Sequence, residues 1–273
     1  MTFTPALPLG GYAGWGFLKR TLPSQTAAFK TSTELKRDDS YFRAQIGKIS
    51  TAEELVNDRR LLSVALGAFG LSDDINNKYF IRKVLEEGTL TTGALSTRLA
   101  DKQYQKMSAA FGFGDFAIPR NKISDFPDKI LTAYRDRQFE IAVGAQNPDL
   151  RLALNVQREL PLIAAKTTSS ENAKWFTVMG NAPLRSVLEK ALGLPNTLGA
   201  LDLDKQLAAF KERTRSQLGS DSMAQFSDPA KVESLIRRFL LRSEVDTFAK
   251  SASGNATLQL IQQASANARF RFT

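Results

Sequence analysis

The sequence predicts an all-α protein, an irregular helical bundle built from two related helical halves that follow an irregular N-terminal arm. Three observations lead to this prediction. Apolar residues recur at helical spacing from Ser40 onward, and helix caps and glycine stops punctuate these stretches. No segment alternates cleanly between polar and apolar residues over five positions, as a half-buried strand does. The chain has 273 residues, 42% of them hydrophobic, which is enough to bury a sizeable core.

Residues 1–35 form the predicted arm. Their three prolines and four glycines argue against a long helix, yet large aromatic side chains lie between these breaks. We expect the part around residues 15–22 to contact the helical body or a neighbouring copy, and the interaction function to reside there. We also expect that deleting residues 1–35 leaves the helical core folded. The candidate partner-binding residues are Tyr12, Trp15, Phe17 and Leu18.

The first helical half is predicted over residues 36–147. Ser50 is a candidate N-cap and Glu53, three residues on, would complete a capping box. Asp58 is expected to cap the next helix, whose apolar stripe ends at Gly70. Asp73 or Asp74 is expected to cap the helix after that, which closes at Gly88.

A short motif recurs and indicates that the halves are related. The segments "LLSVALGAFGL" (61–71) and "LRSVLEKALGL" (184–194) share six identical residues in eleven, and "SAAFGFG" (108–114) ends in a similar way. We interpret each as a helix end at which Gly70, Gly112 or Gly193 adopts a positive φ. The expected caps of these three helices are Asp58, Asp101 and Asn181, and a fourth relative begins near Pro229 without a glycine stop.

The second half is predicted over residues 148–243. A long helix over residues 127–145 is expected to bridge the halves, and the next helix has Pro148 in its first turn and Pro161 bending or ending it. The stretch "SASGNATLQL" predicts a hinge before a C-terminal helix over residues 257–268, so residues 244–273 are assigned to a hinge and helix.

The composition argues against most enzyme chemistry. The chain has no cysteine and no histidine, which excludes disulfides, thiolate metal sites, a cysteine nucleophile and a Ser-His-Asp triad. The acidic stretches at residues 72–77 and 202–204 lack the glycine and the distal glutamate of a calcium loop, and helix capping explains them. We therefore expect no catalytic residue, no cofactor and no metal.

Positive charge is concentrated in the C-terminal part. The chain carries a formal charge of +9, and residues 151–273 contribute 17 basic and 11 acidic side chains, or +6. No helix-turn-helix pattern joins the basic runs, so a solvated helical surface is the favoured interpretation and nucleic-acid binding a minority one. The candidate anion-facing residues are Lys211, Arg213, Arg215, Arg237, Arg238 and Arg242.

Several long motifs carry a resemblance to a known family. They include "YFRAQIGKISTAEELVNDRRLLSVALGAFGL", "RLADKQYQKMSAAFGFGDF", "RLALNVQRELPLIA" and "FSDPAKVESLIRRFL", which together run over residues 41–242. The chain resembles the bacterial family catalogued as domain of unknown function 1217. The resemblance implies a setting near flagellar assembly genes and no established enzymatic activity, and it carries over no catalytic residue.

The leading hypothesis is a non-catalytic interaction or structural protein, accessory to flagellar assembly or structure. Its expected partners are other proteins, which could include flagellar components. The alternatives are a basic protein that binds nucleic acid or an anionic surface, and third a hydrolase that uses carboxylates and a metal. No stretch approaches the roughly 20 apolar residues that span a bilayer. We expect a cytoplasmic protein, or one exported by a flagellar route without a cleaved signal peptide.

Overall fold

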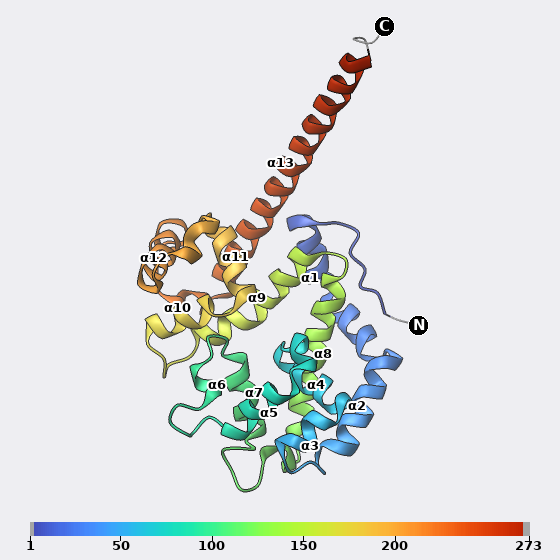
Figure 1. Cartoon of the computed structure of the whole chain (residues 1–273), viewed down its shortest axis with the longest axis vertical. Helices are drawn as coiled ribbons and strands as arrows, with labels where there is room; N and C mark the ends of the chain where they lie inside the picture. The colour runs from blue at the N-terminus through green and yellow to red at the C-terminus, as the bar shows by residue number, and fades with distance from the viewer. Residues whose placement is uncertain (1–2, 270–273) are drawn as a thin grey trace.

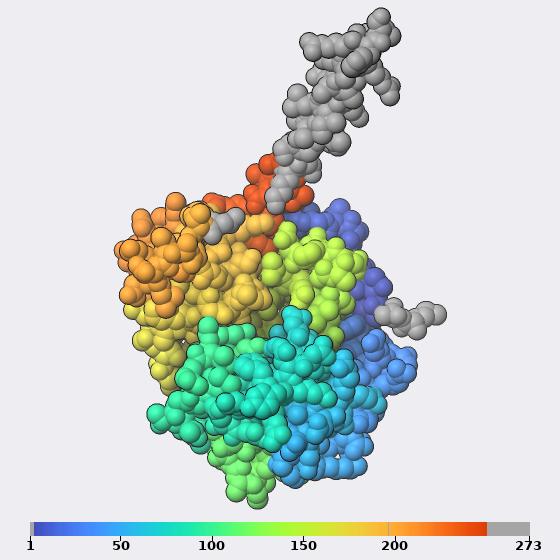
Figure 2. Space-filling view, in the orientation of Figure 1, coloured from blue at the N-terminus to red at the C-terminus, as the bar shows by residue number. Residues whose placement is uncertain are grey.

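The computed structural model describes residues 3–269, with side chains through Ala249 except Asn196. Within that part of the chain the secondary structure is helical throughout, with no strand, which confirms the all-α prediction (Figure 1). Figure 2 shows residues of the first half gathered below those of the second half. No helix among the described residues is long and apolar enough to cross a membrane.

The first half packs around one hydrophobic core and the second half around another. Helices of the first half are α2 (Thr33–Ile46), α3 (Ala52–Asn57), α4 (Arg59–Phe69), α5 (Lys78–Glu87), α6 (Leu95–Arg98) and α7 (Gln103–Phe111). Those of the second are α9 (Pro148–Ala164), α10 (Glu171–Met179), α11 (Ala182–Leu192), α12 (Leu203–Leu218) and α13 (Pro229–Arg269). Short 3-10 helices connect them: η1 (Ser72–Asn76), η2 (Arg120–Lys122), η3 (Asn196–Ala200) and η4 (Met223–Ser227).

Helix α8 (Phe126–Gly144) joins the two cores. Its N-terminal part places Ile130 and Tyr134 in the first core, and its C-terminal part places Phe139 and Val143 in the second. One continuous helix therefore belongs to both hydrophobic clusters. The prediction of a bridging helix is confirmed.

The predicted helix ends are largely confirmed. Gly70, Gly112 and Gly193 all have left-handed backbone, with φ of 76°, 67° and 65°. Asp58 and Asn181 accept hydrogen bonds from the first turns of α4 and α11, as N-caps do.

Three predicted caps differ from the structure. The capping box of α3 is made by Thr51 and Glu54, one residue beyond the predicted pair, because the chain extends by one residue before it turns. Asp101 accepts a hydrogen bond from the backbone of Gln103, although Lys102 is the residue at the N-cap of α7. Asp74 does not cap α5, because η1 intervenes and the Asp74 carboxylate accepts from Asn77 instead.

The relation between the halves extends to an arginine at two of the glycine stops. The guanidinium of Arg137 on α8 donates to the carbonyl of Ala68, 2.8 Å away, at the end of α4. In the second half Arg242 on α13 donates to the carbonyl of Lys190 at the end of α11, at 3.4 Å. In both halves a long helix thus supplies a cation to the carbonyl end of a glycine-terminated helix, where the helix dipole favours positive charge.

The arm differs from its prediction, because Gly11–Lys30 form a 20-residue helix, α1. Among the described residues of the arm, 3–10 are irregular as predicted, and residues 31–32 form the short connection to α2. Pro23 lies inside α1, and the glycines Gly14 and Gly16 are helical. The burial of Trp15 and Leu18 in the second core outweighs the weak helix propensity of these residues. The expectation that proline and glycine prevent a long helix here is wrong.

The predicted C-terminal hinge is also wrong. Helix α13 continues without interruption from Pro229 to Arg269, through the stretch where we expected the break. The single glycine of that stretch, Gly254, lowers helix propensity by about 1 kcal/mol, which is not enough to end a long helix. Similarly, α9 passes through Pro161 and ends at Ala164. Figure 1 shows that α13 leaves the helical body and projects from it.

Candidate functional site

The predicted partner-binding residues lie on α1, which packs against the second half. Trp15 and Leu18 are fully buried in the second core, whereas Tyr12 and Phe17 are partly exposed. In this conformation a partner cannot reach the side chains of Trp15 and Leu18, so we assign these two residues to the core. The expectation that this part of the arm contacts the helical body is confirmed.

Glu233 on α13 is the residue that fastens α1. Its carboxylate accepts hydrogen bonds from the Tyr12 hydroxyl at 3.1 Å, the Trp15 indole at 3.1 Å and the Lys19 ammonium at 2.9 Å. Burial by itself raises the pKa of Glu233, but these three donors outweigh it, and the pKa lies below its ordinary value. No local pattern in the sequence marks Glu233, because its partners lie more than 200 residues away in the chain.

Most of the predicted anion-facing residues have partners within the chain. Arg238 donates to the carbonyl of Gln217, and Arg242 to that of Lys190, so both bind the carbonyl ends of helices. Most of the other members also have partners within the chain. Lys211 bonds Asn172, Arg215 pairs with Asp221, and Arg237 lies over the Tyr12 ring, while Arg213 is exposed and has no side-chain partner among the described residues.

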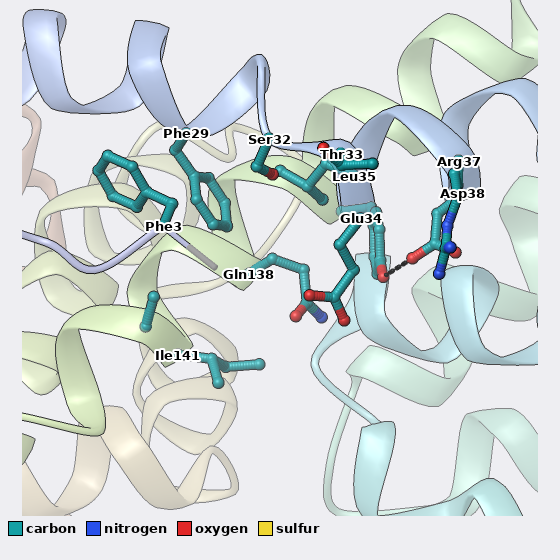
Figure 3. Close-up of a pocket in the computed structure, with 12 residues that line it drawn as sticks. Phe3, Phe29, Ser32, Thr33, Glu34, Leu35, Arg37, Asp38, Gln138 and Ile141 are labelled. Carbon is teal, nitrogen blue, oxygen red and sulfur yellow. Dashed lines mark hydrogen bonds between the residues drawn. The ribbon is translucent and has the colours of Figure 1, made fainter. Parts of the chain in front are cut away.

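One surface pocket lies between the α1–α2 corner and α8 (Figure 3). It has a volume of about 420 Å³. Phe3 and Phe29 form one wall, with ring centroids 5.3 Å apart, and Ile141 lies across from them. Asp38 accepts a hydrogen bond from the Tyr134 hydroxyl at the other end of the pocket. The pocket is therefore an apolar hollow with a charged end, which Glu34, Arg37 and Asp38 line.

A second, larger groove lies between the two halves. It has a volume of about 790 Å³. Residues of α6, α7 and the loop between them line it together with α10, the loop after α9, and the first turns of α11 and α12. None of its described lining residues is acidic. Five of them are cationic: Arg98, Lys102, Lys106, Lys166 and Arg185. We call this feature the basic groove.

The cations of the basic groove differ in how they are held. Lys106 pairs with Glu159, and Arg185 pairs with Glu189, so a carboxylate balances each of these charges. Among the described residues, the partners of the Lys102 ammonium are the backbone carbonyls of Thr97 and Leu99, at 2.7 and 2.9 Å. This places a positive charge firmly at the edge of the groove without neutralising it.

A buried ionic cluster lies at one side of the basic groove, around Glu159 on α9. The Glu159 carboxylate is almost fully buried and binds Lys106 at 3.0 Å and Arg137 at 2.8 Å, and it also pairs with Arg158. Burial raises the pKa of Glu159, but the attraction of the three cations outweighs it and lowers this pKa to about 2. Because Lys106 and Arg137 come from α7 and α8, the cluster ties the first half to the second.

Neither the basic groove nor the ionic cluster was predicted from the sequence. Arg98, Lys102 and Lys106 lie within one short segment, but Lys166 and Arg185 lie 60 residues and more further along the chain. A charge count by segment therefore gave no signal for them. Only the packing of the two halves brings these side chains together.

These features define an all-α protein with two joined helical cores, a basic groove between them and a projecting C-terminal helix. The chain belongs to the family described as "Protein of unknown function (DUF1217)", whose model matches residues 68–232. Its fold is similar to the X-ray structure of protein AGR_C_984 from Agrobacterium tumefaciens, with a TM-score of 0.72 and 23% sequence identity. That match covers 89% of this chain and 99% of the other. A search of curated proteins finds no match to this chain.

Proposed function

We propose that this chain is a non-catalytic helical interaction protein, accessory to flagellar assembly or structure. The flagellar setting is what the resemblance to the DUF1217 family implies. The observation that supports an interaction role is that α13 continues well beyond its last side chains in the second core. The last side chains of α13 that are buried in the second core are those of Phe239 and Leu240, while the helix itself continues to Arg269.

Beyond its packed base, α13 presents apolar side chains to solvent. Leu241, Val245 and Phe248 are 43%, 66% and 79% exposed. Their spacing of four and then three residues puts them on one face of the helix. We call this face the α13 stripe. An isolated helix gains little stability in water, so a helix that continues past its own core is typical of an element that packs against a partner.

The experiment compares flagellar association of the intact chain with that of a variant of the stripe. Hook and basal-body fractions are isolated from the native bacterium and probed for the chain. We expect the wild-type chain in these fractions, and its loss when Val245→Asp and Phe248→Asp are combined. Both side chains are exposed, so we expect the double variant to fold as the wild type does.

The matched control places the same kind of change on another surface. Tyr79 on α5 is 78% exposed, close to Phe248 in size and exposure, so Tyr79→Asp should leave the association unchanged. The proposal fails if the wild-type chain is absent from the flagellar fractions and a deletion strain assembles normal flagella. Equal retention of the wild type and of the stripe variant would remove the α13 stripe from the proposal.

A further inference from the structure

Several cations of the basic groove have no carboxylate partner among the described residues. Among the described residues, the side chains of Arg98 and Lys166 have no hydrogen-bond or ion-pair partner, and the Lys102 ammonium contacts carbonyls alone. Three cations without a carboxylate partner thus face one cavity, and no acidic side chain lines it. Concave walls of low dielectric focus such a field, so the groove attracts negatively charged groups more strongly than a flat surface would.

Between these cations the groove is lined by apolar groups. Phe176 and Met179 of α10 lie on one side, Leu99 and Ala100 on the other, and Leu203 stands at the rim with 53% of its surface exposed. A simple inorganic anion would leave this apolar surface in water. A ligand that matches the groove has negative charges together with apolar groups that cover Phe176 and Leu203.

The distribution of charge separates two macromolecular ligands. A phosphate backbone requires cations that continue along a track. None of the six basic residues expected from the sequence to face anions lines this groove, and four of them are bound within the chain by carbonyl or carboxylate oxygens or an amide. The basic groove is a local patch with an apolar floor, which suits an acidic peptide better than a nucleic acid.

We infer that the basic groove binds an acidic segment of a partner protein, one that carries aspartate or glutamate together with large apolar side chains. This inference rests on the proposed interaction function and gives the chemistry of one partner. The acidic side chains would lie against Arg98, Lys102 and Lys166, and the apolar ones against Phe176 and Leu203. Binding would couple the two halves, because the cations of the groove come from both.

The test uses the full chain and a fluorescently labelled peptide of about 12 residues in which glutamates alternate with leucine and phenylalanine. Combining Arg98→Glu with Lys166→Glu should weaken binding about tenfold or more, because attraction becomes repulsion at two points. The matched control combines Arg213→Glu with Lys36→Glu, two exposed cations outside the groove, and makes the same change in net charge. It should change the affinity by less than about twofold.

Two further probes decide between ligands. A peptide with glutamine in place of glutamate should bind at least about tenfold more weakly than the acidic peptide. Rising salt concentration should lower the affinity of the chain for the acidic peptide. The inference is overturned if groove and control variants bind the acidic peptide equally. It is also overturned if a single-stranded oligonucleotide of equal charge binds more tightly than the peptide and loses affinity in the groove variant, which would establish nucleic-acid binding.

The two proposals can fail separately. If the groove variant retains peptide binding while the α13 stripe variant leaves the flagellar fractions, the inference about the groove is wrong and the proposed function stands. If the chain never associates with flagellar fractions but the groove variant no longer binds the acidic peptide, the proposed function is wrong. The groove of the wild-type chain still recognises acidic segments in that case.

Discussion

Gly70 and Gly193 each end a helix beneath an arginine from another helix. Both have positive φ, and a Cβ at Gly193 would lie 1.9 Å from the Arg242 guanidinium. Two physical requirements therefore select glycine at position 193. The first is the left-handed backbone, and the second is room for the cation that binds the carbonyl end of α11.

We predict that Gly193→Ala lowers the free energy of unfolding by about 1–3 kcal/mol, measured by urea denaturation. The methyl group strains the backbone and also displaces Arg242 from the Lys190 carbonyl. Gly219 separates the two effects, since its φ is 91° but a Cβ there would meet nothing within 4 Å. Gly219→Ala should cost only about 1 kcal/mol. Equal losses in the two variants would show that Arg242 contributes nothing.

Glu159 is the second residue whose role depends on distant partners. We predict that Glu159→Gln destabilises the chain by about 3–5 kcal/mol at neutral pH, because it leaves Lys106, Arg137 and Arg158 without their shared carboxylate. Chemical denaturation of both proteins measures the difference. Glu53→Gln is the control, since Glu53 forms an exposed pair with Arg82 and its loss should cost no more than about 1 kcal/mol.

The pH dependence of this difference has a definite sign. The pKa of Glu159 is about 2 in the folded chain and 4.5 for an unperturbed glutamate. The lowered pKa means that Glu159 stabilises the fold fully above about pH 4.5 and progressively less as the pH falls toward 2. The difference in unfolding free energy between wild type and Glu159→Gln should therefore be smaller at about pH 3 than at pH 7. A difference that grows on acidification would contradict this assignment.

At the scale of elements, α1 belongs to the second core. Its Trp15 ring is completely buried and Glu233 binds three of its side chains. Helix α1 therefore contributes to the second core. That the helical core stays folded after deletion of residues 1–35 stays a prediction. An interaction role for the partly exposed Tyr12 and Phe17 stays a prediction.

We predict that Trp15→Ala lowers the free energy of unfolding by about 3–5 kcal/mol, because it opens a cavity in the second core and removes a donor from Glu233. Thermal unfolding followed by circular dichroism would measure it. Gly16→Ala is a control in the same helix, where a Cβ would meet nothing within 4 Å, and it should stabilise by about 0.5–1 kcal/mol. Unchanged stability of Trp15→Ala would show that α1 is not fastened in solution.

At the scale of the whole molecule, α8 and the Glu159 cluster join the two cores, whereas α13 extends past them. We predict that truncation after Ala249 leaves one cooperative unfolding transition with an unchanged midpoint, since the core residues of α13 among the described side chains precede this point. Calorimetry of the truncated and full chains measures this. A midpoint lower by several degrees would mean that the removed residues pack on the body.

The sequence could predict the features that depend on neighbouring residues. The all-α class, the left-handed glycines and the caps at Asp58 and Asn181 follow from local hydrogen bonding and backbone sterics, which operate within a few positions. The bridging role of α8 could also be predicted, because its length and place between related segments were visible. The predicted break in α1 failed because the burial of Trp15 outweighs the weak helix propensity of its proline and glycines. The predicted break in α13 failed because a single glycine costs a long helix only about 1 kcal/mol.

The helical class and the glycine stops therefore follow from the sequence alone, and the kinship of the two halves stays a prediction. Which charges meet depends on how the two halves pack. The cations of the basic groove, the partners of Glu159 and the donors to Glu233 come from segments far apart in the chain, and no local pattern records their distances. Coulomb attraction and desolvation act through space, so the candidate site appears only once the two halves are packed against each other.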